Sequence, residues 1–427
     1  MKLIIPVTLS LASKVLGQDP GLPVANPTIS YWQLPPLEGV ADHQSDHLST
    51  DVDVVIIGSG MSGTSIAWHL LKENNSATPL RVAMIEARQA CSGATGRNGG
   101  HIRPSSYAEY AGAKMALSQS EAAKITRLRS AHVDALISAA NSLPEEGRLA
   151  AEARVVDSID AFFDEERWKT AVEQVKTLKN EVPDVGAEWS IFENEEARNL
   201  GGNGLPKAGE WPSYTGNRSL AGGRAWSLYR NGLDYIVQMP RNGEFMFGAD
   251  VDGDDANVDT YDDSRAPLHL SASYLNGALP NHFGYDTWGS ERTDFPQSSD
   301  PSVWNGRTKR VWVGIEGSSV DSRPFVGRIP QSVTGRSVKN TSTGSEWVSA
   351  SFDGEGMCFA WLCGRALSRM ISETGSGANA SNGSSTIPEW FPESFLVTEE
   401  RLTKKNVTKR QVRQWTHPRM AKILHWE

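Results

Sequence analysis

Three glycines with a spacing suited to phosphate binding lie near the start of the sequence. Gly58, Gly60 and Gly63 form G-x-G-x-x-G directly after the apolar run 52–57, which has the composition of a buried parallel strand. In such a turn the first glycine allows a tight bend, the second lets a pyrophosphate approach the backbone, and the third lets the next helix pack on the strand. Residues 64–72 have the spacing of an amphipathic helix, whose N-terminus would present N–H groups to phosphates. The pattern predicts a dinucleotide site, the alternative being a glycine-rich turn in another α/β protein.

A second predicted strand supplies a carboxylate for the same ligand. It covers residues 80–85 and ends in Glu86, a little beyond the ~20 residues that usually separate the glycines from the acid that binds ribose hydroxyls. The order of strand, glycines, helix, strand and acid predicts a Rossmann-like domain with a parallel sheet.

The segment 91–101 identifies the expected dinucleotide. It reads Cys-Ser-Gly-Ala-Thr-Gly-Arg-Asn-Gly-Gly-His. Small residues permit close approach of a ligand, and Ser92, Thr95, Arg97 and backbone N–H groups suit phosphate oxygens. The segment resembles one in the D-amino-acid-oxidase superfamily of FAD-dependent oxidoreductases, especially in fungal gamma-glutamylputrescine oxidase-like proteins, where it lies along the FAD pyrophosphate and reaches the flavin. The resemblance implies FAD as the cofactor; the alternative is a flexible surface loop.

A late motif completes the expected cofactor site. Residues 353–371 form a predicted glycine turn and helix, and in the family this turn places backbone N–H groups at the pyrimidine end of the flavin. The helix dipole would stabilise the negative charge of the reduced ring. The expected FAD-binding residues are Gly58, Ser59, Gly60, Met61, Ser62, Gly63, Glu86, Ala87, Arg88, Ser92, Thr95, Gly96, Arg97, Asn98, Gly99, Gly100, Gly354, Glu355, Gly356 and Met357.

Two residues are expected on the substrate side. His101 is the polar group expected nearest the flavin ring, with a structural histidine as the alternative. Residues 321–330 resemble the family's Asp-Gly-x-Pro-x-Val-Gly turn near the ring, and Arg323 stands where relatives commonly have leucine. Arg323 either binds a carboxylate bidentately or is an ordinary surface arginine. The three cysteines have no metal-ligand spacing and are expected to be small buried residues, so no metal is expected.

The resemblance implies oxidation of an amine or amino-acid-like substrate at its C–N bond, by hydride transfer to the flavin, with oxygen as the expected acceptor. The fungal relatives suggest a role in secondary metabolism. Such chemistry depends on positioning the substrate and needs no acid–base dyad, which agrees with the absence of a Ser/His/Asp or paired-carboxylate constellation. Two alternatives remain: a nicotinamide-dependent dehydrogenase, and a catalytically impaired relative or incomplete gene model.

The resemblance also implies the architecture, an α/β fold. A Rossmann-like FAD-binding domain is expected to interleave with an α+β substrate domain that contains an antiparallel sheet. The expected division is a signal peptide at 1–17, an N-terminal arm packed on the surface at 18–50, the FAD-binding domain in two parts at 51–125 and 304–375, a helical region at 126–224, the substrate domain at 225–303, and a linker and C-terminal tail at 376–427.

Periodicity predicts further elements within these parts. Helices are expected at 107–114, 118–140 and 159–182, and strands at 226–229, 233–239, 245–247, 310–316 and 346–352. The acidic stretch 250–263 lacks the spacing of a calcium loop and is interpreted as a solvated loop.

The helical region departs from the family pattern. Residues 187–223 contain no V-x-x-A-T-x-A stretch of the kind that returns the family's chain to the FAD-binding sheet, so the sequence is several tens of residues short here. Either the gene model lost coding sequence or the protein lost a strand beside the adenine half of FAD.

Charge and the N-terminus bear on partners and compartment. The net charge of −9 argues against nucleic acid as a partner, and no apolar run approaches the ~20 residues of a membrane span. Lys2 precedes a short apolar run, and the first 17 residues resemble a secretory signal peptide. Six N-x-S/T sequons are compatible with a secreted glycoprotein; the alternative is a cytoplasmic enzyme. The sequons lie at Asn74, Asn217, Asn340, Asn379, Asn382 and Asn406.

Overall fold

The computed structural model describes residues 21–73, 79–193, 224–229, 232–240, 244–251, 262–264, 274–275, 277–278, 309–335, 345–375 and 387–403. Its elements in chain order are η1 (Tyr31–Gln33), β1 (Val54–Ile57), α2 (Met61–Lys72), β2 (Val82–Ile85), η2 (Ala94–Arg97), α3 (Ser106–Ala116), α4 (Gln119–Asn141), α5 (Glu145–Ala151), β3 (Asp157–Phe162), α6 (Glu165–Glu181), α7 (Pro183–Gly186), β4 (Arg224–Tyr229), β5 (Gly232–Gln238), β6 (Phe245–Val251), β7 (Phe325–Arg328), α12 (Gln331–Thr334), β8 (Trp347–Ala350), η4 (Gly356–Cys358), α13 (Ala360–Gly375), η6 (Glu393–Phe395) and α14 (Glu399–Thr403).

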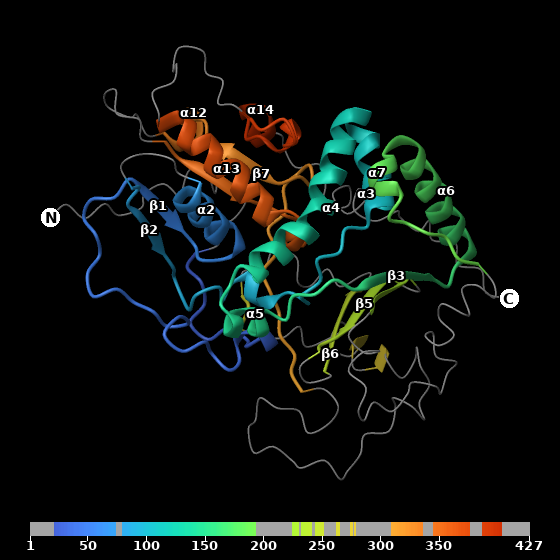
Figure 1. Cartoon of the computed structure of the whole chain (residues 1–427), viewed down its shortest axis with the longest axis horizontal. Coiled ribbons are helices and arrows are strands. Elements are labelled where there is room, and N and C mark those ends of the chain that lie inside the picture. The colour runs from blue at the N-terminus through green and yellow to red at the C-terminus, as the bar shows by residue number, and fades with distance from the viewer. Residues whose placement is uncertain are drawn as a thin grey trace, which may run out of the picture.

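The fold is mixed α/β, as the sequence predicts. The unit of β1, α2 and β2 lies with α13 and β7 on one side of Figure 1, the sheet β3–β6 lies on the other, and α4 runs between them. Strands β1 and β2 are parallel, whereas β4, β5 and β6 are antiparallel and β3 joins β4 in parallel. The parallel dinucleotide-type unit and the separate antiparallel sheet are therefore both present. The predicted domain limits remain a prediction.

The glycine turn has the predicted geometry. Gly58 has a φ of +101°, which favours glycine, and Gly60 is the N-cap of α2. A Cβ on Gly63 would lie 2.0 Å from the carbonyl oxygen of Gly58, so only glycine lets the helix pack this close to the turn. The helix starts at Met61, three residues before the predicted start, because Gly60 already has the extended backbone of a cap.

The prediction that 52–57 is a buried strand is correct on one face only. Ile56 is 6% exposed and packs into the core with α2 and α13, but Val55 is 51% and Ile57 is 88% exposed. Among the described residues β1 pairs with β2 alone, so no further strand continues the sheet there.

The helix predicted over 159–182 begins too early. Residues 159–162 belong to β3, where Ile159 and Ala161 pack on the apolar side of the sheet beside Trp226. The helix α6 starts after Asp164, whose Oδ1 accepts a hydrogen bond of 2.8 Å from the backbone N–H of Arg167. Because Asp164 caps the helix, α6 does not extend before residue 165.

The strand predicted over 310–316 is wrong. These residues form neither helix nor strand and join no ladder in the described part of the chain. Here the backbone forms hydrogen bonds with side chains instead of with another strand. The carbonyl of Val313 accepts from Arg97 at 2.9 Å, and the N–H of Val313 donates to the hydroxyl of Thr28 at 3.2 Å.

Two further strands and their helix pack against the β1–α2–β2 unit. Strands β7 and β8 are antiparallel, and α13 packs across α2 so closely that a Cβ on Gly364 would lie 2.6 Å from the side chain of Ser65. All three cysteines are free thiols, and Cys358 and Cys363 are buried as expected.

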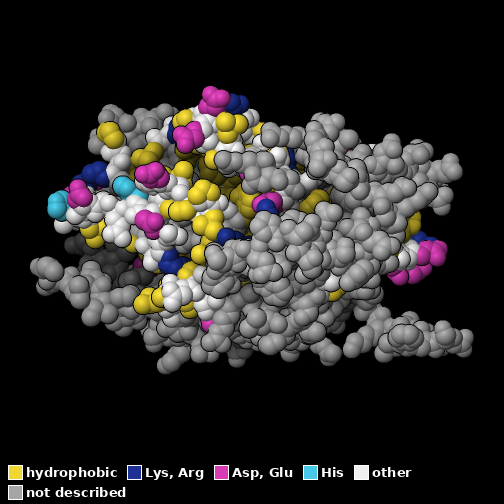
Figure 2. Space-filling view, turned by 90° about the horizontal axis from the view of Figure 1, so that it is seen from below, with side chains coloured by type: hydrophobic (Ala, Val, Ile, Leu, Met, Phe, Trp, Pro, Cys, Tyr) yellow, Lys and Arg dark blue, Asp and Glu magenta, His cyan; other side chains and the backbone are white. Residues whose placement is uncertain are grey.

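None of the described helices combines the length and apolar composition needed to cross a membrane. On the face drawn in Figure 2, basic side chains of the described residues stand among acidic and apolar ones and form no basic patch. The signal-like segment, the stretch 194–223, the turn at 241–243, all six sequons, and the linker and tail beyond residues 375 and 403 lie outside the described residues.

Candidate active site

One cavity of about 2020 Å³ joins the two halves of the molecule. Its walls come from the N-terminus of α2, the segment 95–104, one face of α4, and strands β3, β4 and β5. Of the predicted site residues, those that line it are Met61, Thr95, Gly96, Asn98, Gly99, Gly100, His101 and Met357. The structure thus brings the glycine turn's helix, the 91–101 segment and the late turn to one space.

The 91–101 segment is held against the glycine turn by side chains of both. The hydroxyl of Thr95 accepts from the N–H of Met61 at 2.9 Å, and that of Ser59 accepts from the N–H of Cys91 at 2.9 Å. Asn98 folds the segment back on itself, accepting from the N–H of Gly100 and donating to the carbonyl of Thr95, each at 2.7 Å. The segment is a rigid wall of the cavity.

Glu86 lies beside the glycine turn, outside the cavity lining. Its Oε2 accepts from the N–H and hydroxyl of Ser59, and its Oε1 accepts from the N–H groups of Ala87 and Arg88. Burial raises the pKa of this carboxyl, but these hydrogen bonds outweigh it and hold the pKa below its ordinary value. The group is therefore an anion fixed at the end of β2.

The acidic stretch 250–263 ends in a buried residue, so its interpretation as a solvated loop is wrong at Asp263. The Asp263 carboxylate is 2% exposed and accepts two bonds of 3.0 Å from Arg88, with Arg97 at 3.4 Å. Arg97 also donates to the carbonyl groups of Ser92 and Val313. The guanidinium groups expected at the phosphates are thus largely engaged within the protein, and their role toward phosphate remains a prediction.

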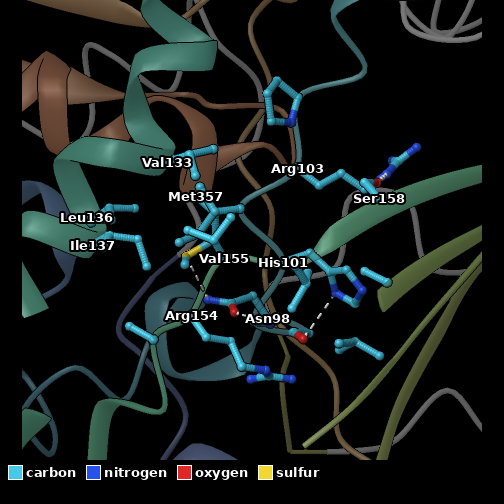
Figure 3. A pocket seen from close by; sticks show the side chains of 18 of the residues that line it. Asn98, His101, Arg103, Val133, Leu136, Ile137, Arg154, Val155, Ser158 and Met357 are labelled. Atoms are coloured by element: carbon cyan, nitrogen blue, oxygen red, sulfur yellow. Dashed lines mark hydrogen bonds between the residues drawn. The ribbon is translucent and has the colours of Figure 1, made fainter. Parts of the chain in front are cut away.

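His101 projects toward the cavity beside β5 (Figure 3). Its Nδ1 lies 3.1 Å from the carbonyl oxygen of Gly99, and its ring meets that of Tyr235 edge to face at 5.1 Å. Burial, with the positive charge of Arg103, lowers the pKa of His101 to about 4, so the imidazole is neutral at physiological pH.

Arg323 does not reach the cavity. It donates to Asp321 at 2.6 Å, and Asp321 also binds Arg401 of α14 at 2.8 Å. Burial raises the pKa of Asp321, but the positive charges and hydrogen bonds of Arg401 and Arg323 outweigh this effect and lower the pKa to about 2. The structure therefore places Arg323 in an ion-pair cluster that joins β7 to α14, and gives no support to a catalytic role.

A polar cluster that the sequence reasoning missed lies beyond His101. Arg103 donates to Ser158 at 2.7 Å and binds Asp160, and the hydroxyl of Tyr107 donates to the same carboxylate at 2.6 Å. These groups line the cavity on β3 and α3. Arg154 also lines it and donates to the carbonyls of Glu152 and Gln238. The expectation of a helix over 159–162 concealed the cluster.

The opposite wall is apolar. Figure 3 shows Val133, Leu136 and Ile137 of α4 facing the same space as Val155 and Met357. Val133, Leu136 and Ile137 have the i, i+3, i+4 spacing of residues on one helix face.

The N-terminal arm contributes to the site, although it was expected on the surface. Ser30 is buried against the carbonyl of Gly96, and Trp32 lines the cavity while its Nε1 donates to the carbonyl of Asn98 at 2.8 Å. The polar composition of the arm concealed this. Beside Trp32, the arm residues that line the cavity are Gln33, Pro36, Leu37, Val40 and Ala41.

The residues present fit an anionic dinucleotide. The start of α2 and the hydroxyl of Thr95 face a cavity whose wall at Gly96, Gly99 and Gly100 carries no side chains. Two buried donors, the Ser92 hydroxyl and Nη2 of Arg97, have no hydrogen-bond partner in the described part of the chain. Donors of this kind suit phosphate oxygens, although neither Ser92 nor Arg97 lines the cavity itself.

Comparisons with known proteins give a family match and similar solved structures. A search of curated proteins gives no match. Among solved structures the chain is similar to L-proline dehydrogenase from P. horikoshii, at 16% identity and a TM-score of 0.45, over 82% of this chain and 98% of that one. Residues 53–198 match the family described as DAO, FAD dependent oxidoreductase. The matched residues include the glycine turn and the 91–101 segment, and the match supports FAD as the cofactor of this part of the chain.

Proposed function

We propose that this protein oxidises the C–N bond of an amine or amino-acid-like small molecule. FAD, when bound, would supply the two-electron acceptor for the hydride that leaves the carbon bearing the amine, and oxygen would be the final acceptor. The observation that carries the proposal is a single cavity that includes both the 95–101 segment and a separate apolar wall on α4. The motif resemblance extends the proposal to an amine of fungal secondary metabolism.

The cofactor would be held by groups on one wall. Thr64 at the start of α2 would lie beside the pyrophosphate, and the hydroxyl of Thr95, which accepts from the N–H of Met61, would donate to a phosphate oxygen. Gly99 and Gly100 would let the backbone approach the ring, and Met357 would contact it from the late turn.

The facing walls suit an amine substrate. Val133, Leu136 and Ile137 would exclude water and orient an alkyl or aryl group against the cofactor. His101 is neutral, so it adds no positive charge that would repel an ammonium group. The charges of Arg103 and Asp160 compensate each other at the cavity's polar end.

The test is the visible absorbance of the purified chain followed by an amine screen. Flavin bands near ~450 nm are expected. Anaerobic addition of the right amine should bleach these bands, and air should restore them with release of hydrogen peroxide. Flavin bands that no amine or amino acid bleaches would contradict C–N oxidation, and re-oxidation by nicotinamide alone would contradict oxygen as the acceptor. A nicotinamide-dependent dehydrogenase would show no flavin bands.

A second candidate, an impaired relative of the family, is favoured by the two-stranded sheet. Val55 and Ile57 leave one face of β1 open, and the described residues provide no strand on its other edge. The sequence also lacks the family's returning strand in residues 187–223. A folded, colourless protein that takes up no added FAD would support this candidate. Sequencing the transcript across 187–223 would separate a lost strand from a faulty gene model.

Secretion is proposed on the signal-like residues 1–17 and the six sequons. Expression of the full chain in a secreting fungal host should deliver it to the medium with an N-terminus near residue 18, and glycosidase should lower its mass. Retention of the whole chain in the cell would favour the cytoplasmic alternative.

A further inference from the structure

We propose that Arg129 is a positioning residue: through Glu355 it holds the turn 351–357 in the conformation that presents it to the cofactor. The inference rests on the proposed role of Gly354–Met357 at the flavin. The inference assigns a role to Arg129 of α4, a residue that no sequence motif indicates.

The turn has a backbone that needs external support. Ser351, Asp353 and Gly354 all have left-handed φ values, +63°, +53° and +78°. Two of the three are not glycine, and such conformations persist only where the surroundings enforce them. The turn makes one backbone bond to a neighbouring segment among those described, from the N–H of Asp353 to the carbonyl of Gly317 at 3.1 Å. Support must therefore come mainly from side chains.

Arg129 supplies the charged part of that support. Its side chain is 6% exposed, and its Nη2 donates to Glu355 Oε2 at 2.6 Å and also to Glu109. Its guanidinium carbon lies 4.4 Å from the ring centroid of Phe359, just after the turn. The buried guanidinium of Arg129 thus contacts Glu355 and Phe359, which lie before and after Gly356 and Met357 in the sequence.

The other end of the same cluster reaches the 91–101 side of the cavity. Glu109 accepts from the N–H of Ser105 at 2.8 Å, four residues after His101. The chain of contacts Ser105, Glu109, Arg129, Glu355 therefore connects the two segments expected to flank the flavin. Any shift of Arg129 would alter the spacing between these two segments.

A second side chain of α4 supports the helix after the turn. His132 accepts from the N–H of Leu362 at 3.0 Å, while its Nδ1 pairs with the carbonyl of Leu128 at 2.7 Å. This contact anchors the first turn of α13 independently of Arg129. Removal of Arg129 should therefore loosen the turn and leave α13 packed.

The test compares FAD binding with stability of the apoprotein. Glu355→Gln, Arg129→Gln and the double variant would be titrated with FAD, and their unfolding midpoints measured without it. The Glu355 side chain is 44% exposed, so Glu355→Gln should fold even if Arg129→Gln does not. Matched controls are Arg365→Gln and Glu73→Gln, whose half-exposed ion pair of 3.2 Å joins α13 to α2 away from the cavity.

Each cluster variant is expected to weaken FAD affinity by about tenfold or more, since a hydrogen bond between charged groups is lost. The double variant should be no weaker than the weaker single, because the two groups act as one unit. Glu355→Gln should keep the apoprotein's unfolding midpoint and change the vibronic shape of the bound flavin's absorbance bands. The controls should bind FAD as the wild type does.

Wild-type affinity in Glu355→Gln would overturn the inference, and so would independent, multiplicative losses in the double variant. Equal losses in the controls would also overturn it, since they would indicate general loosening. Failure of the wild type itself to take up FAD would overturn the proposed function, and this inference with it. The wild-type titration therefore separates the two cases.

Discussion

The carboxylate of Glu86 lies 2.6 Å from the hydroxyl of Ser59 and 2.9 Å from its backbone N–H. The residue expected to bind ribose thus already fixes the glycine turn from the end of the neighbouring strand. Ser59 in turn accepts from the N–H of Cys91, so one hydroxyl connects the three parts of the dinucleotide motif. The anion is the common anchor of the turn.

Replacement of Glu86 by glutamine should therefore weaken both FAD affinity and the fold. We expect a loss of about 1 kcal/mol in the free energy of unfolding, measured by urea denaturation of the apoprotein, because the group is partly solvated. Asp51→Asn is the control: its ion pair with Arg81 is exposed, and the change should cost at most about 0.5 kcal/mol. Equal effects from both variants would show that Glu86 is an ordinary surface acid.

Gly63→Ala should destabilise the protein by about 2 kcal/mol or more, because the added Cβ would lie 2.0 Å from the Gly58 carbonyl and must move the helix or the turn. The control is Gly147→Ala in α5, where the nearest atom would be at an ordinary 3.4 Å. That change should be neutral or stabilising by up to about 1 kcal/mol, from helix propensity alone. Thermal unfolding of the two variants in parallel makes the comparison.

Stability should fall as the pH is lowered, because burial lowers the pKa of His69, His101 and His132 in the folded protein. Burial lowers the pKa of His101 and of His132 from 6.5 to about 4, so the unfolded chain takes up these protons first. The stabilisation is complete above pH 6.5 and is lost progressively toward pH 4, by about 2 kcal/mol per histidine near pH ~5. Burial raises the pKa of Glu109, which contributes with the opposite sign and partly offsets the loss.

Urea unfolding of the apoprotein at several pH values would measure this slope. His132→Gln removes one titrating group while retaining an acceptor for the N–H of Leu362. The variant should show a flatter profile than the wild type between about pH 4 and 6.5. An unchanged profile would mean that folding does not lower the pKa of His132.

Asp263→Asn should be among the most damaging single changes, at about 3 kcal/mol or more, since it leaves two buried guanidinium groups without their counter-charge. Asp184→Asn serves as the control, because its pair with Arg127 is half exposed and should contribute less than about 1 kcal/mol. Asp263→Asn should also raise the Kd for FAD, since Arg97 would lose its fixed position. Chemical denaturation and an FAD titration would measure the two effects separately.

The sequence predicted features that depend on near neighbours, and missed those that depend on distant ones. The roles of Gly58 and Gly63 follow from a local turn, and the structure has them as predicted. The burial of Asp263 depends on Arg88, 175 positions earlier, and composition alone suggested a solvated loop. Strand β3 is set by pairing with β4, more than sixty positions later, which outweighs the helical pattern of the residues that follow it.

The two residues expected on the substrate side should now behave differently. Arg323 lies outside the cavity and pairs with Asp321, so Arg323→Ala should leave FAD affinity and the KM for the amine unchanged. It should cost about 1 kcal/mol of stability, because Arg401 still compensates the carboxylate. His101→Gln, by contrast, changes a buried cavity wall beside Tyr235 and should raise KM or lower kcat about tenfold. Steady-state kinetics of both variants, on any amine that bleaches the flavin, would measure these changes. A tenfold change in KM or kcat for Arg323→Ala would show that Arg323 acts in the active site.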